Sequence, residues 1–410
     1  MLHRFKIKHF KELWRMVSVE EAKNQVLDKY GVMETIKVSP EHALGYALAQ
    51  DIISPFSLPS FRQSAMDGYA VSLNEDYEYI CKGEVAAGQK ASYNLMRGEA
   101  VRIFTGAQVP DTANAVIMQE WVEAEGVHPP YNIRLSENKE IRPELNIRPI
   151  GEQLAKGDKA LIKGTVLNPA AIGLLESLGL DEIEVHRKPK ISLLISGNEL
   201  VQRGGELKEA QIFESNSSTL KSALLNASYT DVSISFCKDT LEDTIIALTS
   251  AIENSDVVIT SGGISVGDHD HLEAAFGKLQ VEQCFYKVRQ KPGKPLFFGT
   301  KENKSVFGLP GNPASALTCL YAYIIPHLNM RSGFNQADNL TIKLPLSKDV
   351  MVKGDRSIFF KGKIQDGTIS PLGGQASSML QSFAYSNALI YLQARATPYK
   401  AGELVDVILI

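Results

Sequence analysis

Hydrophobic and polar positions change their spacing several times along the chain, and each change predicts a different kind of element. From about residue 18 to 46, apolar and charged residues alternate at helical spacing, with Ser18 and Glu21 placed as a capping box. In residues 55–149 the apolar runs are short and separated by glycine, proline and asparagine, which is typical of antiparallel strands. The pattern then becomes mixed, and proline at a first turn predicts a helix from Pro169.

Strand-like and helix-like segments alternate from Lys188 to Ser332. Helices are predicted over Ser217–Ala227, from Thr240 onward and over Pro313–Leu328, with short apolar runs between them. This alternation predicts a three-layer α/β/α domain with a mostly parallel sheet. The helical signal then ends, and Leu340–Ile410 reads as short strands and turns, for which we expect a small β-barrel.

These changes predict a multidomain fold of α/β plus β type. A chain of 410 residues is long enough for several cores. We expect an elongated mixed helical and extended domain made of two separate stretches, 15–54 and 150–187, with an inserted β domain at 55–149. The α/β domain is expected at 188–332 and the C-terminal β-barrel domain at 333–410.

Composition and charge exclude several classes of protein. The formal net charge is -4, without the basic excess that nucleic-acid-binding proteins usually carry, so any anion site must be local. No run of 18 or more apolar residues exists, so we expect no membrane span, and the N-terminus does not resemble a secretory signal. The cysteines lack the close spacing of zinc or redox sites, which indicates incidental thiols in a reducing, cytoplasmic compartment: Cys81, Cys237, Cys284 and Cys319.

Three loops rich in glycine or proline lie between Thr260 and Pro313. They are residues 261–270, 291–295 and 309–315, and each follows or adjoins an apolar run that predicts a buried strand. Repeated junctions of this kind favour a ligand that lies across the carboxyl ends of a mostly parallel sheet.

The first loop has the residues of an anion site. Its glycines let backbone N–H groups approach an anion, and Ser261 and Ser265 add hydroxyl donors. Asp268 and Asp270 are hard carboxylates that can hold Mg²⁺ against phosphate oxygens. The alternatives are a tight turn with two solvated acids, or a transition-metal site in the Asp-His-Asp-His string of residues 268–271, although no third soft ligand is evident nearby.

The other two loops add positive charge and backbone amides. Lys291 and Lys294 lie on a loop stiffened by prolines, and because like charges repel, their spacing predicts a shared anionic partner. Residues 310–313 form a rigid turn before a helix, whose first amides, with Ser315, would make an oxyanion cradle. The alternatives are a solvated loop for the lysines and simple helix initiation by proline for the turn.

Three further residues stand out elsewhere. Asp67 lies between apolar residues and a glycine, so it is either a turn acid or a site acid from a second domain. Thr105 follows an apolar strand and either faces a ligand or begins a turn. Glu199 lies at the end of a predicted strand, where ligand-facing groups accumulate in such sheets.

Taken together, these strings resemble a known family. Six of them occur in the family's order, and the resemblance covers nearly the whole chain: residues 64–70, 105–107, 196–200, 261–268, 291–295 and 308–313. The chain resembles the molybdopterin molybdenumtransferases of the MoeA type, which are related to the gephyrin E domain.

The resemblance implies a transferase that completes molybdenum-cofactor synthesis. Members of the family insert molybdate into adenylylated molybdopterin and cleave the adenylate, releasing AMP, with Mg²⁺ present. The resemblance also implies that the α/β domain is of the molybdopterin-binding kind. It further implies an elongated homodimer with a shared active site, and it makes a molybdopterin adenylyltransferase a possible upstream partner.

The resemblance also assigns roles to single residues. The implied catalytic residues are Asp67, Thr105, Glu199, Asp239 and Asp270. The implied substrate-binding residues are Ser261, Gly262, Gly263, Ser265, Lys291, Lys294, Pro310, Gly311, Asn312, Pro313, Ser315 and Arg356, and Asp268 with Asp270 would hold Mg²⁺. The chain departs from the family at Gln153, where an acid is usual, so Glu152 either substitutes for that acid or the acid is dispensable.

Two other functions stay open at this point. A molybdopterin adenylyltransferase shares the Ser-Gly-Gly loop and the α/β domain, but it is normally a single small domain. A gephyrin-like scaffold would bind partners without catalysis, but nothing in this sequence resembles an attached linker or second enzymatic domain.

Overall fold

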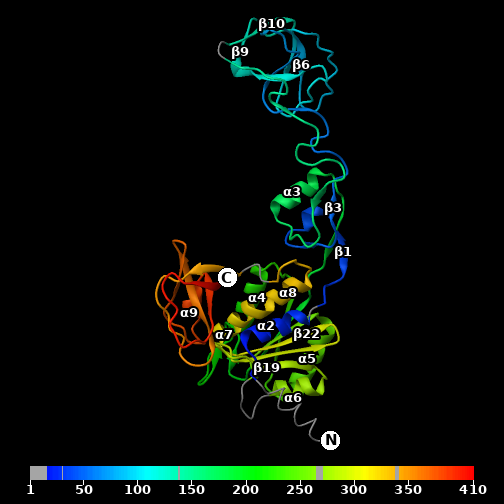
Figure 1. The fold of residues 1–410 in the computed structure, drawn as a ribbon. Coiled ribbons are helices and arrows are strands. Elements are labelled where there is room, and N and C mark those ends of the chain that lie inside the picture. The colour runs from blue at the N-terminus through cyan, green and yellow to red at the C-terminus, as the bar shows by residue number, and fades with distance from the viewer. Residues whose placement is uncertain (1–15, 30, 137–138, 265–270, 338–340) are drawn as a thin grey trace, which may run out of the picture. The chain divides into compact units, whose positions relative to one another are not determined.

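The chain forms two compact units. The computed structural model describes residues 16–410 except 30, 137–138, 265–270 and 338–340. The larger unit comprises residues up to 49, 164–169 and 182–410, and the smaller one comprises 50–163 and 170–181 (Figure 1). Across the described ranges, no helix is both long and apolar enough to cross a membrane.

The larger unit is built on a six-stranded mixed sheet with the order β17-β14-β18-β22-β21-β19. Its strands are β14 (Ile191–Ser196), β17 (Val232–Cys237), β18 (Val257–Ser261), β19 (Glu282–Lys287), β21 (Pro295–Lys301) and β22 (Lys304–Leu309). The first four strands in that order are parallel, whereas β21 pairs antiparallel with both β22 and β19. Only a tight turn joins β21 to β22, with Lys301 paired to Lys304, and such a hairpin requires antiparallel pairing.

Helices cover both apolar faces of this sheet (Figure 1). On one face, Leu193 of β14 shares a core with helices α2, α4, α7 and α8; on the other, Leu194 shares a core with α5 and α6. The bounds are α2 (Val19–Asp28), α4 (Asn216–Asn226), α5 (Leu241–Asn254), α6 (His271–Lys278), α7 (Pro313–Cys319) and α8 (Ile325–Arg331). Because both faces are buried, β14 carries no exposed position, which explains why the consecutive residues Leu193, Leu194 and Ile195 are all apolar.

Helix starts with capping residues were predicted well, and the helix predicted over Ser217–Ala227 is observed one residue earlier as α4. The ends of the first and last predicted helices were wrong. Ser18 Oγ accepts from Glu21 N at 3.0 Å before α2, and Thr240 Oγ1 accepts from Asp243 N at 3.2 Å before α5. The helical pattern predicted up to residue 46 was wrong beyond Asp28. The β-branched segment Thr35–Val38 forms strand β1, which pairs with β13 (Ile183–His186), and β13 also pairs with β2 (Ala47–Leu48).

The predicted helix over residues 313–328 is interrupted and extends to Arg331. Between α7 and α8, Leu320–Ile324 forms a π-helical turn, η3. Pro326 is the second residue of α8, and a proline has no backbone N–H for regular helical bonding, which fits a local change of helix type there.

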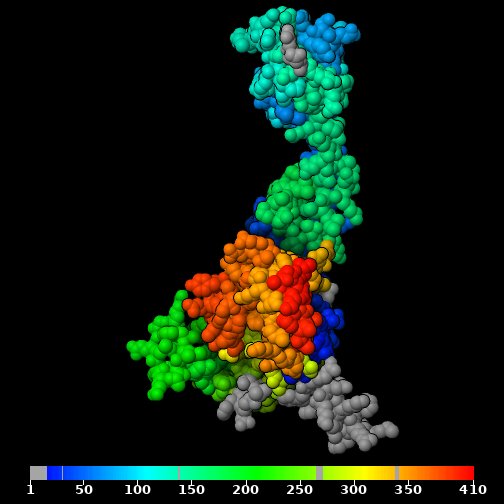
Figure 2. All heavy atoms as spheres, turned by 60° about the vertical axis from the view of Figure 1, so that its left-hand side comes forward, coloured from blue at the N-terminus to red at the C-terminus, as the bar shows by residue number. Residues whose placement is uncertain are grey.

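Residues 341–410, coloured orange to red in Figure 2, add a second sheet to the larger unit. It has the order β20-β24-β26-β27-β23, and β25 pairs with β24. The bounds are β20 (Gln290–Lys291), β23 (Thr341–Pro345), β24 (Ser357–Gln365), β25 (Thr368–Pro371), β26 (Ala388–Leu392) and β27 (Leu404–Leu409). An isolated bridge joins Leu346 to Ile369. The sequence predicted no helix in this segment, but helix α9 occupies Leu380–Ala384.

The smaller unit holds a six-stranded sheet of order β8-β5-β7-β6-β10-β9. Its strands are β5 (Gly68–Val71), β6 (Glu78–Val85), β7 (Glu99–Ile103), β8 (Ala115–Met118), β9 (Val122–Ala124) and β10 (Tyr131–Leu135). All pairs are antiparallel except β6 with β7, so the antiparallel prediction was wrong there. Residues 86–98 separate β6 from β7, and this long connection carries the chain back for parallel pairing.

Short elements complete both units. In the smaller unit β4 (Gln63–Ser64) pairs with β11 (Ile147–Arg148), β3 (Ile52–Ile53) pairs with β12 (Lys159–Leu161), and α3 (Pro169–Ser177) begins at the predicted proline. In the larger unit, β15 (Leu200–Val201) pairs with β16 (Ile212–Phe213). The remaining short elements are the 3₁₀ helices η1 (Pro40–His42) and η2 (Gln119–Trp121).

Candidate active site

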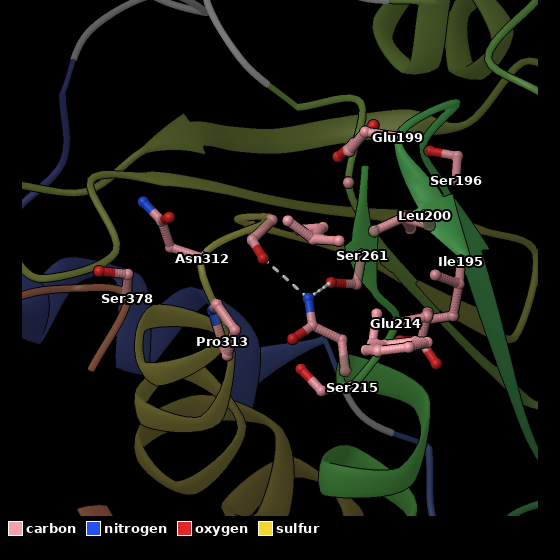
Figure 3. A pocket seen from close by; sticks show the side chains of 15 residues that line it. Ile195, Ser196, Glu199, Leu200, Glu214, Ser215, Ser261, Asn312, Pro313 and Ser378 are labelled. Atoms are coloured by element: carbon pink, nitrogen blue, oxygen red, sulfur yellow. Dashed lines mark hydrogen bonds between the residues drawn. The ribbon is translucent and has the colours of Figure 1, made fainter. Parts of the chain in front are cut away.

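The glycine loop after β18 and the turn after β22 meet at one edge of the mixed sheet. The two strands are parallel neighbours, and Ser261 pairs in register with Leu309, so both loops leave at the carboxyl edge. Asn216, at the start of α4, joins them: its Nδ2 donates to Ser261 Oγ at 2.9 Å and to Gly311 O at 2.8 Å (Figure 3). The sequence did not single out Asn216, because nothing local shows that its amide bridges two distant loops.

Glycine is required at the first of these loops. Gly262 has a φ of +95°, and a Cβ there would lie 2.1 Å from Ser196 O. Gly263 also has a positive φ, of +62°. The loop therefore passes against the end of β14 with no room for a side chain at residue 262.

The glycine-loop pocket opens beside these residues and has a volume of about 500 Å³. Figure 3 shows Ser196 and Glu199 on one side of it and Asn312 and Pro313 on the other. It is lined by Ile195, Ser196, Glu199, Leu200, Ile212, Phe213, Glu214, Ser215, Asn216, Ser261, Gly262, Gly311, Asn312, Pro313 and Ser378. One acid has a structural role, because Glu214 accepts hydrogen bonds from Ser217 N, at 2.8 Å, and from the Ser217 hydroxyl at the start of α4.

A second, cationic pocket lies over the lysine loop, and we call it the lysine-loop pocket. Its volume is about 410 Å³, and Asn312 lines both pockets. Three cations line it, Lys291, Lys294 and Arg356, and no acidic side chain is among its lining residues. These are Gln290, Lys291, Pro292, Gly293, Lys294, Pro295, Pro310, Asn312, Ser315, Arg356, Gln375, Ala376 and Ser377. Unbalanced positive charge in a concave site attracts an anion.

A buried amide fixes the backbone of the lysine loop. Gln290 is 0% exposed; its Nε2 donates to Gly293 O at 3.0 Å, and its Oε1 accepts from the Tyr323 hydroxyl. Gly293 has a φ of +83°, and a Cβ there would lie 2.7 Å from Cys319 Sγ. Lys291 and Lys294 are exposed on this anchored loop. Gln290 and Tyr323 were not predicted as site residues. Gln290 is only a polar residue beside an apolar run, and Tyr323 lies within an apolar helix.

The sequence predicted that the first backbone amides of α7 are free to bind an oxyanion, and this was wrong for Ala314 and Ser315. Ala314 N and Ser315 N donate to Ser377 O at 3.1 and 3.3 Å. The Ser315 residue is 2% exposed and lines the lysine-loop pocket. Ser315 N also donates to Asn312 O at 3.0 Å, so a loop of the C-terminal segment and the turn itself together satisfy the two amides that the sequence predicted to be free.

Two of the predicted acids lie at neighbouring strand ends. Glu199 follows β14 and Asp239 follows β17, and these strands pair in parallel. Asp239 N donates to Asn198 Oδ1 at 3.3 Å, which joins the two loops. Both acids supply the oxygen ligands that Mg²⁺ prefers. The other predicted members of this edge, Ser265, Asp268 and Asp270, lie outside the described residues, and so do most of the Asp-His-Asp-His positions.

In the smaller unit, Asp67 and Thr105 lie together. Asp67 Oδ1 accepts from Thr105 N at 2.7 Å and from Thr105 Oγ1 at 2.8 Å. These hydrogen bonds hold the pKa of the Asp67 carboxyl below its usual range, so it is an anion at neutral pH. Both residues are exposed, so the pair is a charged group on the surface of this unit.

The remaining predictions on this site concern metals, thiols and Gln153. Where the structure describes the chain, no group of three or more histidine, cysteine or acidic side chains is placed to hold a metal ion. All four cysteines are free thiols, and burial raises the pKa of Cys319 to about 12. Gln153 and Glu152 are both exposed, and Gln153 N donates to Leu58 O at 3.0 Å.

Comparison with known proteins identifies the family. Residues 17–179 match the MoeA N-terminal region (domain I and II), 192–330 a probable molybdopterin binding domain, and 343–410 the MoeA C-terminal region (domain IV). The molybdopterin molybdenumtransferase of Haemophilus influenzae is 34% identical over 406 residues, covering 96% of this chain and 98% of that protein. The chain belongs to the MoeA family.

Other members of the MoeA family agree with this assignment. The molybdopterin molybdenumtransferase of Staphylococcus epidermidis is 30% identical over 409 residues, covering 96% of this chain and 95% of that protein. The crystal structure of the molybdopterin biosynthesis MoeA protein from Pyrococcus horikoshii has a TM-score of 0.81 and 29% identity, covering 97% of this chain and 100% of that one. The MoeA resemblance predicted from the six strings is thus confirmed, as is the predicted multidomain fold. The sheet expected to be mostly parallel is mixed, with β21 antiparallel to both of its neighbours.

Proposed function

We propose that this protein is a molybdopterin molybdenumtransferase, an enzyme that inserts molybdate into adenylylated molybdopterin and releases AMP. The name carried by its relatives supports this activity. The observation that carries it in the structure is the lysine-loop pocket, where three cations and no acid surround a space of about 410 Å³. Molybdate is a dianion and the other substrate carries phosphates, so both need such positive charge.

Each pocket has a proposed task. Lys291, Lys294, Arg356 and Ser315 hold molybdate or a substrate phosphate in the lysine-loop pocket. The neighbouring pocket receives the organic part of the substrate against Ser261, Gly262 and the turn Pro310–Pro313, whose member Asn312 reaches both pockets. Gly263 also binds substrate in this proposal, and Ser265 helps to hold the oxyanion. Molybdenum binds to the sulfurs of the substrate, so no protein thiol is required.

The acids have electrostatic and water-positioning roles in this proposal. Glu199 and Asp239 follow neighbouring parallel strands, and Asp67 with Thr105 belongs to the smaller unit. Asp270, in the sequence of the glycine loop, completes the proposed set of acids. Mg²⁺ would be held by Asp268 and Asp270, and the carboxylates of Glu199 and Asp239 have oxygen ligands of the kind that suits the same hard cation. When bound, Mg²⁺ neutralises phosphate charge while the adenylate is cleaved.

The proposal includes an assembly and a domain division. In this proposal the protein is a cytoplasmic homodimer whose two subunits share their active sites. A molybdopterin adenylyltransferase is the upstream partner. The four domains are 15–54 with 150–187, 55–149, 188–332 and 333–410. Helices on both faces of the mixed sheet support a three-layer α/β/α domain, and the Leu346–Ile369 bridge supports a C-terminal β-barrel.

The direct experiment measures AMP release. Purified protein is mixed with adenylylated molybdopterin, Mg²⁺ and increasing molybdate, and AMP is quantified. We expect molybdate-dependent release, with the molybdate KM raised at least about tenfold in Lys294→Ala, since a charge-assisted hydrogen bond is lost. Lys278→Ala, an exposed lysine at the end of α6, is the control and should behave like the wild type. Absence of AMP from the folded wild-type protein would refute the proposed activity.

A further inference from the structure

A buried lysine outside the proposed chemistry lies behind the lysine-loop pocket. Lys361, on β24, is 3% exposed. Its ammonium donates to three backbone carbonyls, those of Gly374 at 2.7 Å, Ala376 at 3.2 Å and Met379 at 3.1 Å. Across the described residues, no acidic side chain forms an ion pair with it within 4.0 Å. A cation is therefore buried in a cage of carbonyl dipoles without a counter-ion.

These carbonyls belong to residues 374–379, which we call the wall loop because it borders both pockets. Gln375, Ala376 and Ser377 line the lysine-loop pocket, and Ser378 lines the glycine-loop pocket. Gln375 adds a second anchor to the same strand residue: its Oε1 accepts from Lys361 N at 3.0 Å, and its Nε2 donates to Lys361 O at 2.9 Å. Lys361 thus holds the wall loop through its side chain and its backbone.

The wall loop in turn contacts the turn before α7. Ser377 O accepts from Ala314 N and Ser315 N, and Ser377 Oγ accepts from Asn312 Nδ2 at 3.1 Å. Asn312 is the residue that lines both pockets. A continuous chain of hydrogen bonds therefore runs from the Lys361 ammonium, through the wall loop, to the turn at the centre of the site.

Burying an ammonium is costly unless its donors are satisfied, and here three carbonyls satisfy them. Burial still lowers the pKa of Lys361 below its usual value. A cation without a counter-ion, in surroundings of low dielectric, interacts more favourably with an anion placed nearby than a solvated lysine does. The geometry therefore favours an oxyanion on the other side of the wall loop.

We propose that Lys361 is a positioning residue of the active site: its ammonium holds the wall loop between the two pockets and adds positive charge behind the oxyanion. This inference rests on the proposed function and adds a residue to it. Lys361 itself does not touch the substrate in this account. It acts through Ala376, a lining residue of the lysine-loop pocket whose carbonyl accepts from Lys361. It also acts through Ser377, which hydrogen-bonds to the turn before α7.

The test measures oxyanion binding directly, with molybdate as the probe and the full-length protein in the calorimeter. We expect Lys361→Met, which removes charge and donors at similar size, to raise the Kd for molybdate at least about tenfold. Lys361→Arg, which retains both, should stay within about threefold of the wild type. Lys363→Met is the matched control, an exposed lysine on the same strand, and should bind like the wild type.

The inference would be overturned if Lys361→Met bound molybdate as tightly as the wild type. It would also be overturned if Lys361→Met and Lys363→Met lost molybdate binding to the same extent. A loss in Lys361→Arg as large as that in Lys361→Met would also overturn it, because the charge would then be irrelevant. In AMP release, we expect Lys361→Met to raise the molybdate KM by the same factor and to change kcat by less than about threefold.

A second measurement does not depend on how any variant folds. In the wild-type protein, saturating molybdate should slow hydrogen exchange of the Ala314 and Ser315 amides, which bond to the wall loop, at least about tenfold. If molybdate left the exchange of these amides unchanged, the proposed position of the wall loop beside the bound oxyanion would be contradicted. Absence of AMP release combined with these binding and exchange results would refute the transferase activity but leave the role of Lys361 in oxyanion binding intact.

Discussion

Several buried polar side chains of this protein are held by backbone carbonyls or hydroxyls rather than by opposite charges. His327, on α8, is 0% exposed, and its Nδ1 lies 2.9 Å from Val26 O. A carbonyl only accepts, so Nδ1 carries the proton, and Nε2 accepts from Ser305 Oγ at 2.8 Å. Burial, with a smaller contribution from the charge of Arg331, lowers the pKa of His327 to about 3. The imidazole is therefore neutral and joins α2 to α8.

His327 predicts a loss of stability in acid. The unfolded chain takes up a proton near pH 6.5, whereas the folded protein does so only near pH 3, so the unfolded state binds more protons in between. The contribution is complete above pH 6.5 and is lost as the pH falls toward 3. We expect a slope of about 1.4 kcal/mol per pH unit in the free energy of unfolding, measured by urea titration. The slope should be smaller by this amount in His327→Gln, and equal slopes would contradict the assignment.

Asp67 predicts a loss of turnover without a loss of structure. In Asp67→Asn the amide oxygen can still accept from Thr105 N and Thr105 Oγ1, so only the charge disappears. We expect AMP release to fall at least about tenfold, with an unchanged melting temperature. Asp76→Asn, an exposed acid in the same unit, should retain full activity. Wild-type activity in Asp67→Asn would remove this residue from the site.

At the scale of elements, capping signals and loop residues were read correctly, whereas the helical pattern beyond Asp28 and the distant contacts were not. The capping box at Ser18 and the helix start at Thr240 were predicted because a cap depends on residues three positions away. The parallel pairing of β6 with β7 depends on the path of a long connection, which apolar alternation does not reveal. The lysine and glycine loops were found because glycine, proline and charge mark them locally, whereas Ser377 over α7 and the Asn216 bridge arise only from the fold.

The glycine loop predicts a sharp difference between two glycines. In Gly262→Ala, the Cβ would lie 2.1 Å from Ser196 O at a φ of +95°, so the loop or the end of β14 must move. We expect a loss of about 1–3 kcal/mol in the free energy of unfolding. In Gly311→Ala, the nearest atom to the Cβ is Gly262 Cα at 3.8 Å, so stability should change by less than about 0.5 kcal/mol. Similar losses in both variants, measured by urea unfolding, would contradict this account.

At the scale of the whole chain, the mixed sheet shares its core with segments from both ends of the sequence. Val19 and Val26 of α2, and Phe359 and Leu389 of the C-terminal sheet, lie in one cluster with the strands of the mixed sheet. The predicted domain boundaries rest on changes in the spacing of apolar residues along the sequence. Such changes cannot show that a helix from one end and a sheet from the other complete the same core.

This shared core predicts that residues 188–332 do not fold on their own. Without α2 and the C-terminal sheet, one face of the mixed sheet loses part of its cover and exposes apolar surface. We expect the isolated segment to bind a hydrophobic dye and to lack a cooperative unfolding transition, whereas the full-length chain unfolds cooperatively. A cooperative transition with little dye binding would show that the segment is an independent domain.

The pairing of β20 with β24 has a consequence for how such proteins can be recombined. Lys291 pairs with Ile358, and Ser357 N donates to Arg289 O at 3.2 Å, so the lysine loop begins in an edge strand of the C-terminal sheet. A chimaera that imports only residues 343–410 from a relative would join a foreign edge to the native loop and shift Lys291. Grafts should therefore exchange Arg289–Lys294 together with the C-terminal segment, and natural recombination between relatives is constrained in the same way.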